Sequence, residues 1–481
     1  MTGARVLRRT RRSLPFALAL LAAAVPRASA TTFVADRLTD NQTNGCALGG
    51  CTLREAVLAA NVHAGADVVA MTEGRYVLQR AGTGEDAGQT GDLDLRGPLT
   101  ITGEGAKKTF IDAQPIGISA PDSGDRVFDL HGGDVTVRGI RMDNSEVRGD
   151  GGAIRAVGHG SLLLRGTGVG DATAARGRGG GIFTQRGYSL RLVESRVDND
   201  HAGRSGGGIY SVGKLVVTNS AVDDNHAGGN GGSIFAAGRT EISRSAIHDS
   251  EARSFGGAIG ASGRLTLRSS VVSDSRARLG GGGVWLKGGA ARDSISRTTM
   301  VSLHAEGPSA KGGAILVDGP RLGITNSTIA YDDSKGGGAG VAVASGRVLL
   351  SSSTVTQNDS RRRGGGLLSA GGVVAMRNTI VAANKEGRRP SDCVGSIRSK
   401  GHNLSGFHCA GLGARGDVRT RHPLLGPVQN HGGPSPTASL RSGSPAINAG
   451  GPGCPPRDQR GFRRRGRCDI GAFEFRGRRG G

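Results

Sequence analysis

Residues 206–226 read GGGIYSVGKLVVTNSAVDDNH, and the same pattern returns from Gly231 as GGSIFAAGRTEISRSAIHDSE. Each copy starts with glycines, continues with three short apolar pieces and closes on Asp or Asn. The pieces alternate apolar with polar positions, which is typical of β-strands rather than helices. The stretch therefore predicts one unit of a repeat, with glycine and Asn or Asp at the bends.

An aliphatic residue follows the glycine cluster in nine copies of this pattern. The nine residues are Ile154, Ile182, Ile209, Ile234, Ile259, Val284, Ile315, Val341 and Leu367. Three short strands in a unit of about 25 residues are typical of one turn of a parallel β-helix. Successive turns would stack about 4.8 Å apart around a narrow core of Ile, Val, Leu and Ala.

Composition favours such a solenoid over several globular domains. The 481 residues include 86 Gly but only 1 Trp, 4 Tyr and 11 Phe. A narrow tube has little room for large aromatic side chains, and a corner repeated in every turn needs glycine. Glycine richness also allows disorder, but the regular apolar positions provide a core.

The first 30 residues are predicted to be a signal peptide. Five arginines between Arg5 and Arg12 precede the apolar run LPFALALLAAAV, and small residues follow. We predict cleavage after Ala30 and an exported bacterial protein, with the export route left open by the paired arginines. No transmembrane segment is expected in the mature chain.

Six cysteines lie outside the repeats and form three sequence-local pairs. Of the 15 possible pairings, the most economical joins Cys46 to Cys51, Cys393 to Cys409 and Cys454 to Cys468. Zinc is the alternative, but the sequence has no Cys-x-x-Cys pair. Disulfides are therefore predicted, in agreement with export.

Both ends of the repeat region carry different segments. Residues 51–61 read CTLREAVLAAN, the one strongly helical stretch, in which Thr52 and Glu55 have the spacing of a capping box. We expect this helix to cover the first turn. From Asp392 onward, glycine pairs give way to cysteine, proline and arginine, which predicts a terminal module.

The two end segments resemble those of a group of bacterial exported proteins. CTLREAVLAAN resembles the CSLREA segment, with Thr52 in place of Ser. GSPAINAG, followed by DQRGFRRRGRCDIGAFE, is similar to the C-terminal module called choice-of-anchor Q, with Phe473 where Tyr is common. The resemblance implies a right-handed parallel β-helix that is exported and often surface-associated, and it implies no established reaction.

These observations predict an all-β protein: a single-stranded, right-handed parallel β-helix, a pectate-lyase-like solenoid, with a short N-terminal capping helix and a disulfide-bearing C-terminal module. The predicted parts are a signal peptide (1–30), an N-terminal cap (31–66), β-helix repeats (67–391), a C-terminal module (392–475) and a basic tail (476–481).

The formal net charge is +22, of which six arginines belong to the predicted signal peptide. Basic clusters at 361–363 and 457–479 are typical of a solvated surface, or of attraction to a polyanion such as acidic polysaccharide, another envelope polymer or extracellular DNA. Few aromatics and no nucleic-acid module argue against specific nucleic-acid recognition. We expect a monomer that is secreted or held at the cell surface.

Asp224, Asp249 and Asp274 recur at one position of the repeat, beside a second row that includes His201 and His226. Stacked turns would place the three carboxylates in one line, where they could bind calcium or act in catalysis. Asp is also favoured in tight bends, because its side chain accepts from local backbone N–H groups. The turn interpretation is favoured; no catalytic residue and no cofactor other than this calcium is assigned.

Two functional classes follow. The favoured one is a noncatalytic exported β-helix whose basic surface serves adhesion or binding of acidic polymers. The alternative is a polysaccharide lyase or glycoside hydrolase that acts on acidic polysaccharide along the solenoid. No Gly-x-Ser-x-Gly elbow sits on a strand-to-helix turn, so nucleophilic hydrolase chemistry has no support.

Overall fold

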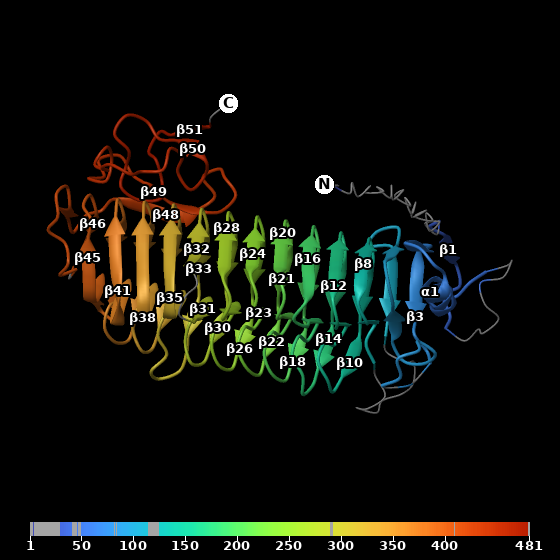
Figure 1. The fold of residues 1–481 in the computed structure, drawn as a ribbon. Coiled ribbons are helices and arrows are strands. Elements are labelled where there is room, and N and C mark those ends of the chain that lie inside the picture. The colour runs from blue at the N-terminus through green and yellow to red at the C-terminus, as the bar shows by residue number, and fades with distance from the viewer. Residues whose placement is uncertain are drawn as a thin grey trace.

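In the computed structural model, the chain winds into one parallel β-solenoid (Figure 1). The structure describes residues 3, 29–40, 46, 50–80, 82, 84–113, 125–288, 292–407 and 409–479. The predicted fold class is confirmed. Most of the predicted signal peptide lies outside the described residues, so cleavage after Ala30 stays a prediction. No helix in the described part of the chain is both long and apolar enough to cross a membrane.

The first sheet has 22 strands, and most turns contribute two of them. Its strands are β1 (Thr32–Ala35), β2 (Asp67–Met71), β4 (Leu93–Leu95), β5 (Leu99–Thr102), β7 (Phe128–Leu130), β8 (Gly133–Arg138), β11 (Ile154–Ala156), β12 (Gly160–Arg165), β15 (Ile182–Thr184), β16 (Tyr188–Val193), β19 (Ile209–Ser211), β20 (Leu215–Thr218), β23 (Ile234–Ala236), β24 (Thr240–Ser243), β27 (Ile259–Ala261), β28 (Leu265–Arg268), β31 (Val284–Lys287), β32 (Arg292–Ser296), β35 (Ile315–Thr325), β38 (Val341–Ser351), β41 (Leu367–Arg377) and β45 (Cys393–Ser399).

The second sheet has 14 strands. They are β3 (Gly74–Val77), β6 (Thr109–Asp112), β9 (Arg141–Asp143), β13 (Gly168–Gly170), β17 (Arg196–Asp198), β21 (Ala221–Asp223), β25 (Ala246–His248), β29 (Val271–Ser273), β33 (Thr299–Val301), β36 (Thr328–Ala330), β39 (Thr354–Thr356), β42 (Ile380–Ala382), β46 (Leu404–Ser405) and β47 (Val418–Arg419).

The third sheet has 11 strands, most of them two residues long. They are β10 (Ser145–Val147), β14 (Ala172–Ala174), β18 (His201–Ala202), β22 (His226–Ala227), β26 (Glu251–Ala252), β30 (Arg276–Ala277), β34 (His304–Ala305), β37 (Asp333–Ser334), β40 (Asp359–Ser360), β43 (Lys385–Glu386) and β44 (Arg389–Pro390). These pieces are too short for an alternating pattern, so sequence predicted three strands per turn where a turn such as β19 to β22 has four. In the turns of β35 and β38 the first two strands are continuous, and three strands remain.

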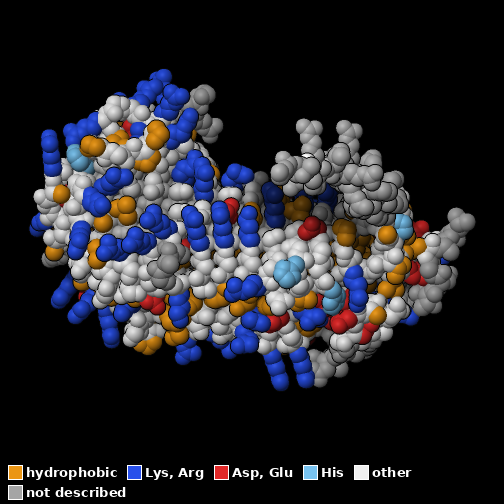
Figure 2. Space-filling model, viewed as in Figure 1, with side chains coloured by type: hydrophobic (Ala, Val, Ile, Leu, Met, Phe, Trp, Pro, Cys, Tyr) orange, Lys and Arg blue, Asp and Glu red, His pale blue; other side chains and the backbone are white. Residues whose placement is uncertain are grey.

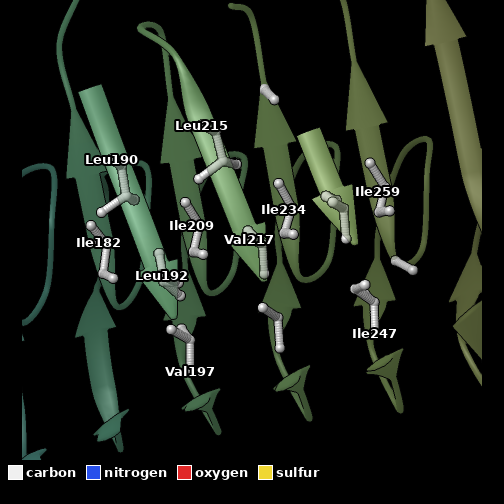
Figure 3. Close-up of a cluster of buried hydrophobic side chains, with 14 of the residues drawn as sticks. Ile182, Leu190, Leu192, Val197, Ile209, Leu215, Val217, Ile234, Ile247 and Ile259 are labelled. Carbon is white, nitrogen blue, oxygen red and sulfur yellow. The ribbon is translucent and has the colours of Figure 1, made fainter. Parts of the chain in front are cut away.

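The nine aliphatic residues of the repeat stack in one continuous register inside the solenoid. Ile182 pairs with Ile209, Ile209 with Ile234, and Ile234 with Ile259 (Figure 3). Leu190 and Leu215 form a parallel row from the second strand of each turn. All are essentially fully buried, so each turn adds a layer of aliphatic side chains to one core.

The glycine clusters form the corner before the first strand of each turn. Gly231 has a left-handed backbone, with φ of +68°, which disfavours residues with a Cβ. A Cβ on Gly232 would lie 2.0 Å from the carbonyl oxygen of Gly257 in the next turn. The first glycine therefore supplies backbone shape, and the second permits close stacking of the turns.

Several aromatic side chains lie on the outside of the first sheet rather than in the core. Phe183, Tyr210 and Phe235 occupy one outward position in successive turns, with ring centroids 5.7 and 5.2 Å apart. The guanidinium of Arg178 lies 5.0 Å from the Phe183 ring centroid and 4.9 Å from that of Tyr210. The ring faces are therefore occupied by neighbouring side chains.

The N-terminal cap is the predicted helix, α1 (Leu53–Val62). Thr52 and Glu55 form the expected capping box, and the apolar face packs on the first turns. Arg54 is buried against Asp40, with Nε to Oδ1 at 2.7 Å, and also donates to three backbone carbonyls. The motif thus combines a helix cap with a buried ion pair. Strand β1, which lies inside the predicted cap (31–66), already pairs with β2 of the first sheet.

The three predicted disulfides are present: Cys46–Cys51, Cys393–Cys409 and Cys454–Cys468. Strands β45, β46 and β47 lie beyond the predicted boundary at 391, yet they pair in parallel with the preceding strands. The stacked turns therefore extend into the predicted C-terminal module.

The rest of that module folds back over the second sheet (Figure 1, red). It contains two antiparallel pairs, β48 (Leu425–Gln429) with β49 (Thr437–Leu440), and β50 (Phe462–Arg463) with β51 (Arg478–Arg479). Gln459 bonds with Thr299 and Thr328, and the N–H of Gly471 donates to the carbonyl of Asn378. The module therefore covers the side of several turns. Within the predicted basic tail, Arg478 and Arg479 form strand β51, which pairs with β50.

Candidate functional site

The three predicted calcium ligands lie at one exposed corner of the solenoid. Asp224, Asp249 and Asp274 have left-handed φ values of 57°, 50° and 50°, and each follows a strand of the second sheet. Asp249 also lies 2.6 Å from Nδ1 of His248. Left-handed backbone at an Asp is what a tight bend requires, so these residues have a structural reason to recur. Calcium binding here stays a prediction.

A row of cations crosses the first sheet, one per turn. Four members immediately precede or begin the second strand of a turn, two lie within the long strands β35 and β38, and all six are exposed. We call it the cation ladder: Lys214, Arg239, Arg264, Arg292, Arg321 and Arg347. Arg292 pairs with Arg321, and Arg321 with Arg347, in direct register. The first three occupy adjacent positions, since their carbonyls accept from the turn before.

The cation ladder is about 24 Å long, given a rise of about 4.8 Å per turn. Among the residues that the structure describes, Arg239 is its one member with an ion-pair partner, Glu241 at 2.6 Å. Figure 2 shows Lys and Arg side chains gathered over this face around β24 to β35, with few acidic side chains among them. Its positive charge is therefore largely uncompensated by protein carboxylates.

Two further features favour an extended anionic ligand on this face. Half-buried hydroxyls from Thr218, Ser243, Ser296 and Thr325 lie in a second row near the far end of the same strands, in which Arg268 stands between Ser243 and Ser296. At the adjoining corner, burial, with Arg268 and Arg457 close by, lowers the pKa of the Arg297 guanidinium. A repeated cation beside a repeated hydroxyl suits a polymer that carries both carboxylates and hydroxyls.

A shallow groove runs along the third sheet, in two adjoining hollows of about 360 and 350 Å³. One outward position per turn forms a row along this sheet, in the order Thr173, His201, His226, Glu251, Arg276, His304 and Asp333, and the first five of these residues line the hollows. This row brings the two histidines noted in the sequence together, with ring centroids 4.8 Å apart.

This row contains histidines in opposite electrostatic settings. Burial, with neighbouring His226, lowers the pKa of His201. A hydrogen bond with Asp333 raises the pKa of His304. Between them, Glu251 binds Arg276 at 2.6 Å and lies 3.6 Å from Nδ1 of His226. A histidine held neutral near pH 7 can accept a proton, so the groove has one element of acid–base chemistry.

The basic clusters predicted from sequence divide between buried and exposed positions. Arg460 pairs with Asp458 at 2.7 Å and Arg464 with Glu474 at 3.1 Å, and all four side chains are at most 6% exposed. These two arginines hold the C-terminal module together rather than facing solvent. Arg361 and Arg362 are exposed.

The cation ladder was not predicted, although the sequence carries its signal. A Lys or Arg stands before the second apolar piece in GKLVV, GRTEI, GRLTL, PRLGIT and GRVLL. Each cation alone is an ordinary surface residue, and only alignment of this position across turns identifies the row.

No protein-family model matches the chain, and neither does any curated protein sequence. Among solved structures, the complex of XylC with xylose is similar, with a TM-score of 0.50 at 9% identity, over 93% of this chain and 99% of that one. Pectate lyase Pel9A matches with a TM-score of 0.37 at 12% identity, over 93% and 97%. The A-module of the Azotobacter vinelandii mannuronan C-5 epimerase AlgE6 has a TM-score of 0.29 at 15% identity, over 76% and 91%. At these identities the likeness is one of fold.

Proposed function

We propose that this protein binds acidic polysaccharide along the cation ladder and does not transform it. The observation that carries the proposal is the register of six exposed cations, from Lys214 to Arg347, on successive turns. A solenoid repeats its surface at a fixed rise of about 4.8 Å, so it presents charge as a line rather than as a patch. A linear polyanion can contact such a line over many residues at once.

Acidic polysaccharide suits this face better than single-stranded nucleic acid. Binding of single strands relies on aromatic side chains with free ring faces on which bases stack. The aromatic row of Phe183, Tyr210 and Phe235 has its faces occupied by one another and by Arg178. Hydroxyl side chains beside the cations can instead bond with sugar hydroxyls and carboxylates. XylC, which has the same type of fold, was solved with xylose.

The test compares two triple variants of equal charge. Arg264→Gln, Arg292→Gln and Arg321→Gln remove half of the ladder, whereas Arg361→Gln, Arg362→Gln and Arg388→Gln remove three exposed arginines at bends elsewhere. Affinity for polygalacturonate would be measured by calorimetry, with neutral dextran as the ligand control.

The ladder variant should bind polygalacturonate about 10- to 100-fold more weakly, because each lost contact between an arginine and a polymer carboxylate costs roughly 0.5–1 kcal/mol. The control variant should bind within about twofold of wild type. Equal losses in both variants would mean that net charge alone drives binding, and the ladder would have no special role. Absence of binding by the wild-type protein would overturn the proposal.

A lyase is the second candidate, and the groove on the third sheet favours it. β-Elimination in a polyuronate needs a base that takes the proton from the carbon beside the carboxylate, and the lowered pKa of His201 favours the neutral form of its imidazole. The assay follows unsaturated product from polygalacturonate. Turnover that His201→Gln abolishes, and that the exposed turn variant His159→Gln retains, would establish the lyase and replace the noncatalytic proposal.

We further propose that the protein is exported and belongs with the CSLREA and choice-of-anchor Q proteins. The fold and its three disulfides support this assignment. So do the CTLREA segment, which forms the cap, and the CDIGAFE segment, which docks the terminal module. Mass spectrometry of the secreted protein would locate its N-terminus, which is expected at Thr31.

A further inference from the structure

Four potential metal ligands converge near the N-terminal end of the first sheet. Asp94 on β4 and Asp129 on β7 are register partners in adjacent turns. His131 follows β7, and Asp86 comes from the connection between β3 and β4. One ligand atom from each of these four residues lies within 4.8 Å of all the others. In the described part of the chain, this is the single group of His, Cys, Asp and Glu side chains that satisfies that distance.

The distances within this group are close to those of a shared ion. Nε2 of His131 lies 2.5 Å from Oδ1 of Asp94, 3.9 Å from Oδ1 of Asp86 and 4.0 Å from Oδ2 of Asp129. Atoms that bind one ion at about 2.0–2.2 Å lie about 3–4 Å from one another. Small side-chain rotations would therefore bring the four ligand atoms around one centre.

Asp94 supplies an independent indication that a ligand is missing from this group. Its side chain is 1% exposed, and its Oδ2 atom is buried without a hydrogen-bond partner. Burial of a carboxylate oxygen without a hydrogen-bond partner costs free energy, because its hydration is lost and no protein hydrogen bond replaces it. A cation bound between Asp94 and its neighbours would satisfy it.

The charge around the group also favours a cation, in a protein that is otherwise strongly basic. Arg126 is shared among three carboxyl groups, at 3.2 Å from Asp92, 3.5 Å from Asp125 and 3.8 Å from Asp129. Arg155 pairs with Asp129 as well. Asp86 and Asp94 bring the number of carboxyl groups to five, against the guanidinium groups of Arg126, Arg155 and Arg96, the last of which donates to the carbonyl of Asp86.

We infer that Asp86, Asp94, Asp129 and His131 bind a divalent transition-metal ion of the zinc or manganese type. An imidazole nitrogen among the ligands separates this site from calcium and magnesium sites, which use oxygen. Because Asp86 lies on the connection between β3 and β4, the ion would link that connection to strands β4 and β7 of the first sheet. The site is separate from the cation ladder and does not depend on polysaccharide binding.

The test uses the full chain after treatment with a chelator, titrated with Zn²⁺, Mn²⁺ or Ca²⁺ by calorimetry and by thermal unfolding. We expect one equivalent of Zn²⁺ or Mn²⁺ to bind and to raise Tm. His131→Gln and Asp86→Asn should each weaken binding at least about tenfold. Asp134→Asn on neighbouring β8, which carries an exposed carboxylate outside the group, is the matched control and should bind as wild type does.

Asp86 has a 66% exposed side chain, so its variant should fold even if substitution at His131 disturbs the structure. The assignment is overturned if the wild-type protein binds neither Zn²⁺ nor Mn²⁺ at one equivalent, or if His131→Gln and Asp86→Asn both bind as tightly as Asp134→Asn. Ca²⁺ binding that His131→Gln leaves unchanged, without Zn²⁺ or Mn²⁺ binding, would also overturn it.

Discussion

Asp200 and Asn225 occupy the same corner position in successive turns, and the backbone N–H of Asp200 donates to Oδ1 of Asn225 at 3.0 Å. Nδ2 of Asn225 donates in turn to the carbonyl of Val197 at 3.2 Å. Asp200 cannot repeat this pattern. Its Oδ1 accepts from the N–H of Ala172 at 3.0 Å, and its buried Oδ2 has no partner.

Replacement of Asp200 by Asn should therefore stabilise the protein by about 1–2 kcal/mol near neutral pH, because the new amide can donate to the carbonyl of Val169, the register partner of Val197. Urea unfolding of the variant and wild type at equal pH measures the difference. A variant that unfolds at a lower urea concentration than wild type would contradict this account of the corner.

The advantage of Asp200→Asn should grow with pH. Burial is the main cause that raises the pKa of Asp200 well above 3.8, and the nearby carboxylates of Asp198 and Asp171 raise it further. The hydrogen bond from the N–H of Ala172 and the charge of Arg141 act in the opposite direction. The folded state holds this proton more tightly than the unfolded state, so the contribution to stability is complete below pH 3.8 and is lost as pH rises through the higher pKa. Unfolding curves from pH 4 to 8 should converge at the acidic end, and parallel pH profiles would refute the prediction.

Gly232→Ala should destabilise the protein by about 2–3 kcal/mol, since its Cβ would meet the carbonyl of Gly257 at 2.0 Å. Gly323→Ala is the matched control, because a Cβ there has no neighbour within 4 Å. The free energy of unfolding of the control should fall by less than about 1 kcal/mol or rise slightly. Thermal unfolding compares the two, and equal effects would argue against close stacking as the role of the second corner glycine.

Glu474→Gln should loosen the C-terminal module. Glu474 is buried, pairs with Arg464 and accepts from the backbone N–H groups of Arg465 and Asp469. Loss of its charge leaves Arg464 buried without its counter-ion, at a cost of about 3 kcal/mol. Limited proteolysis should release residues beyond about 420 sooner than in wild type, whereas exposed Arg476→Gln should behave normally. Unchanged proteolysis of Glu474→Gln would contradict the prediction.

Val373→Arg should extend the cation ladder by one turn, since Val373 is the register partner of Arg347. One more exposed cation should tighten binding of polygalacturonate about two- to fivefold, at roughly 0.5–1 kcal/mol. Val216→Arg, which adds the same charge on β20 two residues beyond Lys214, serves as the comparison. An equal gain in both variants would show that the register of the added charge does not matter.

Sequence alone determined the repeat and its core. The spacing from Ile154 to Leu367 identified residues that stack in one register, because a solenoid turns short-range periodicity into contact between turns. The capping box at Thr52 and the local disulfides were also predictable, since each depends on residues close together in the chain.

Only the tertiary structure decided the rest, because it depends on register between residues far apart in sequence. The cation ladder required the pairing of positions 25 to 29 residues apart, each unremarkable alone. The group around Asp94 and His131 lies where turns differ in length, so no periodic pattern brings Asp86 and Asp129 together. The C-terminal module docks on the side of the solenoid through Gln459 and Thr328, 131 residues apart, a contact that no local pattern contains.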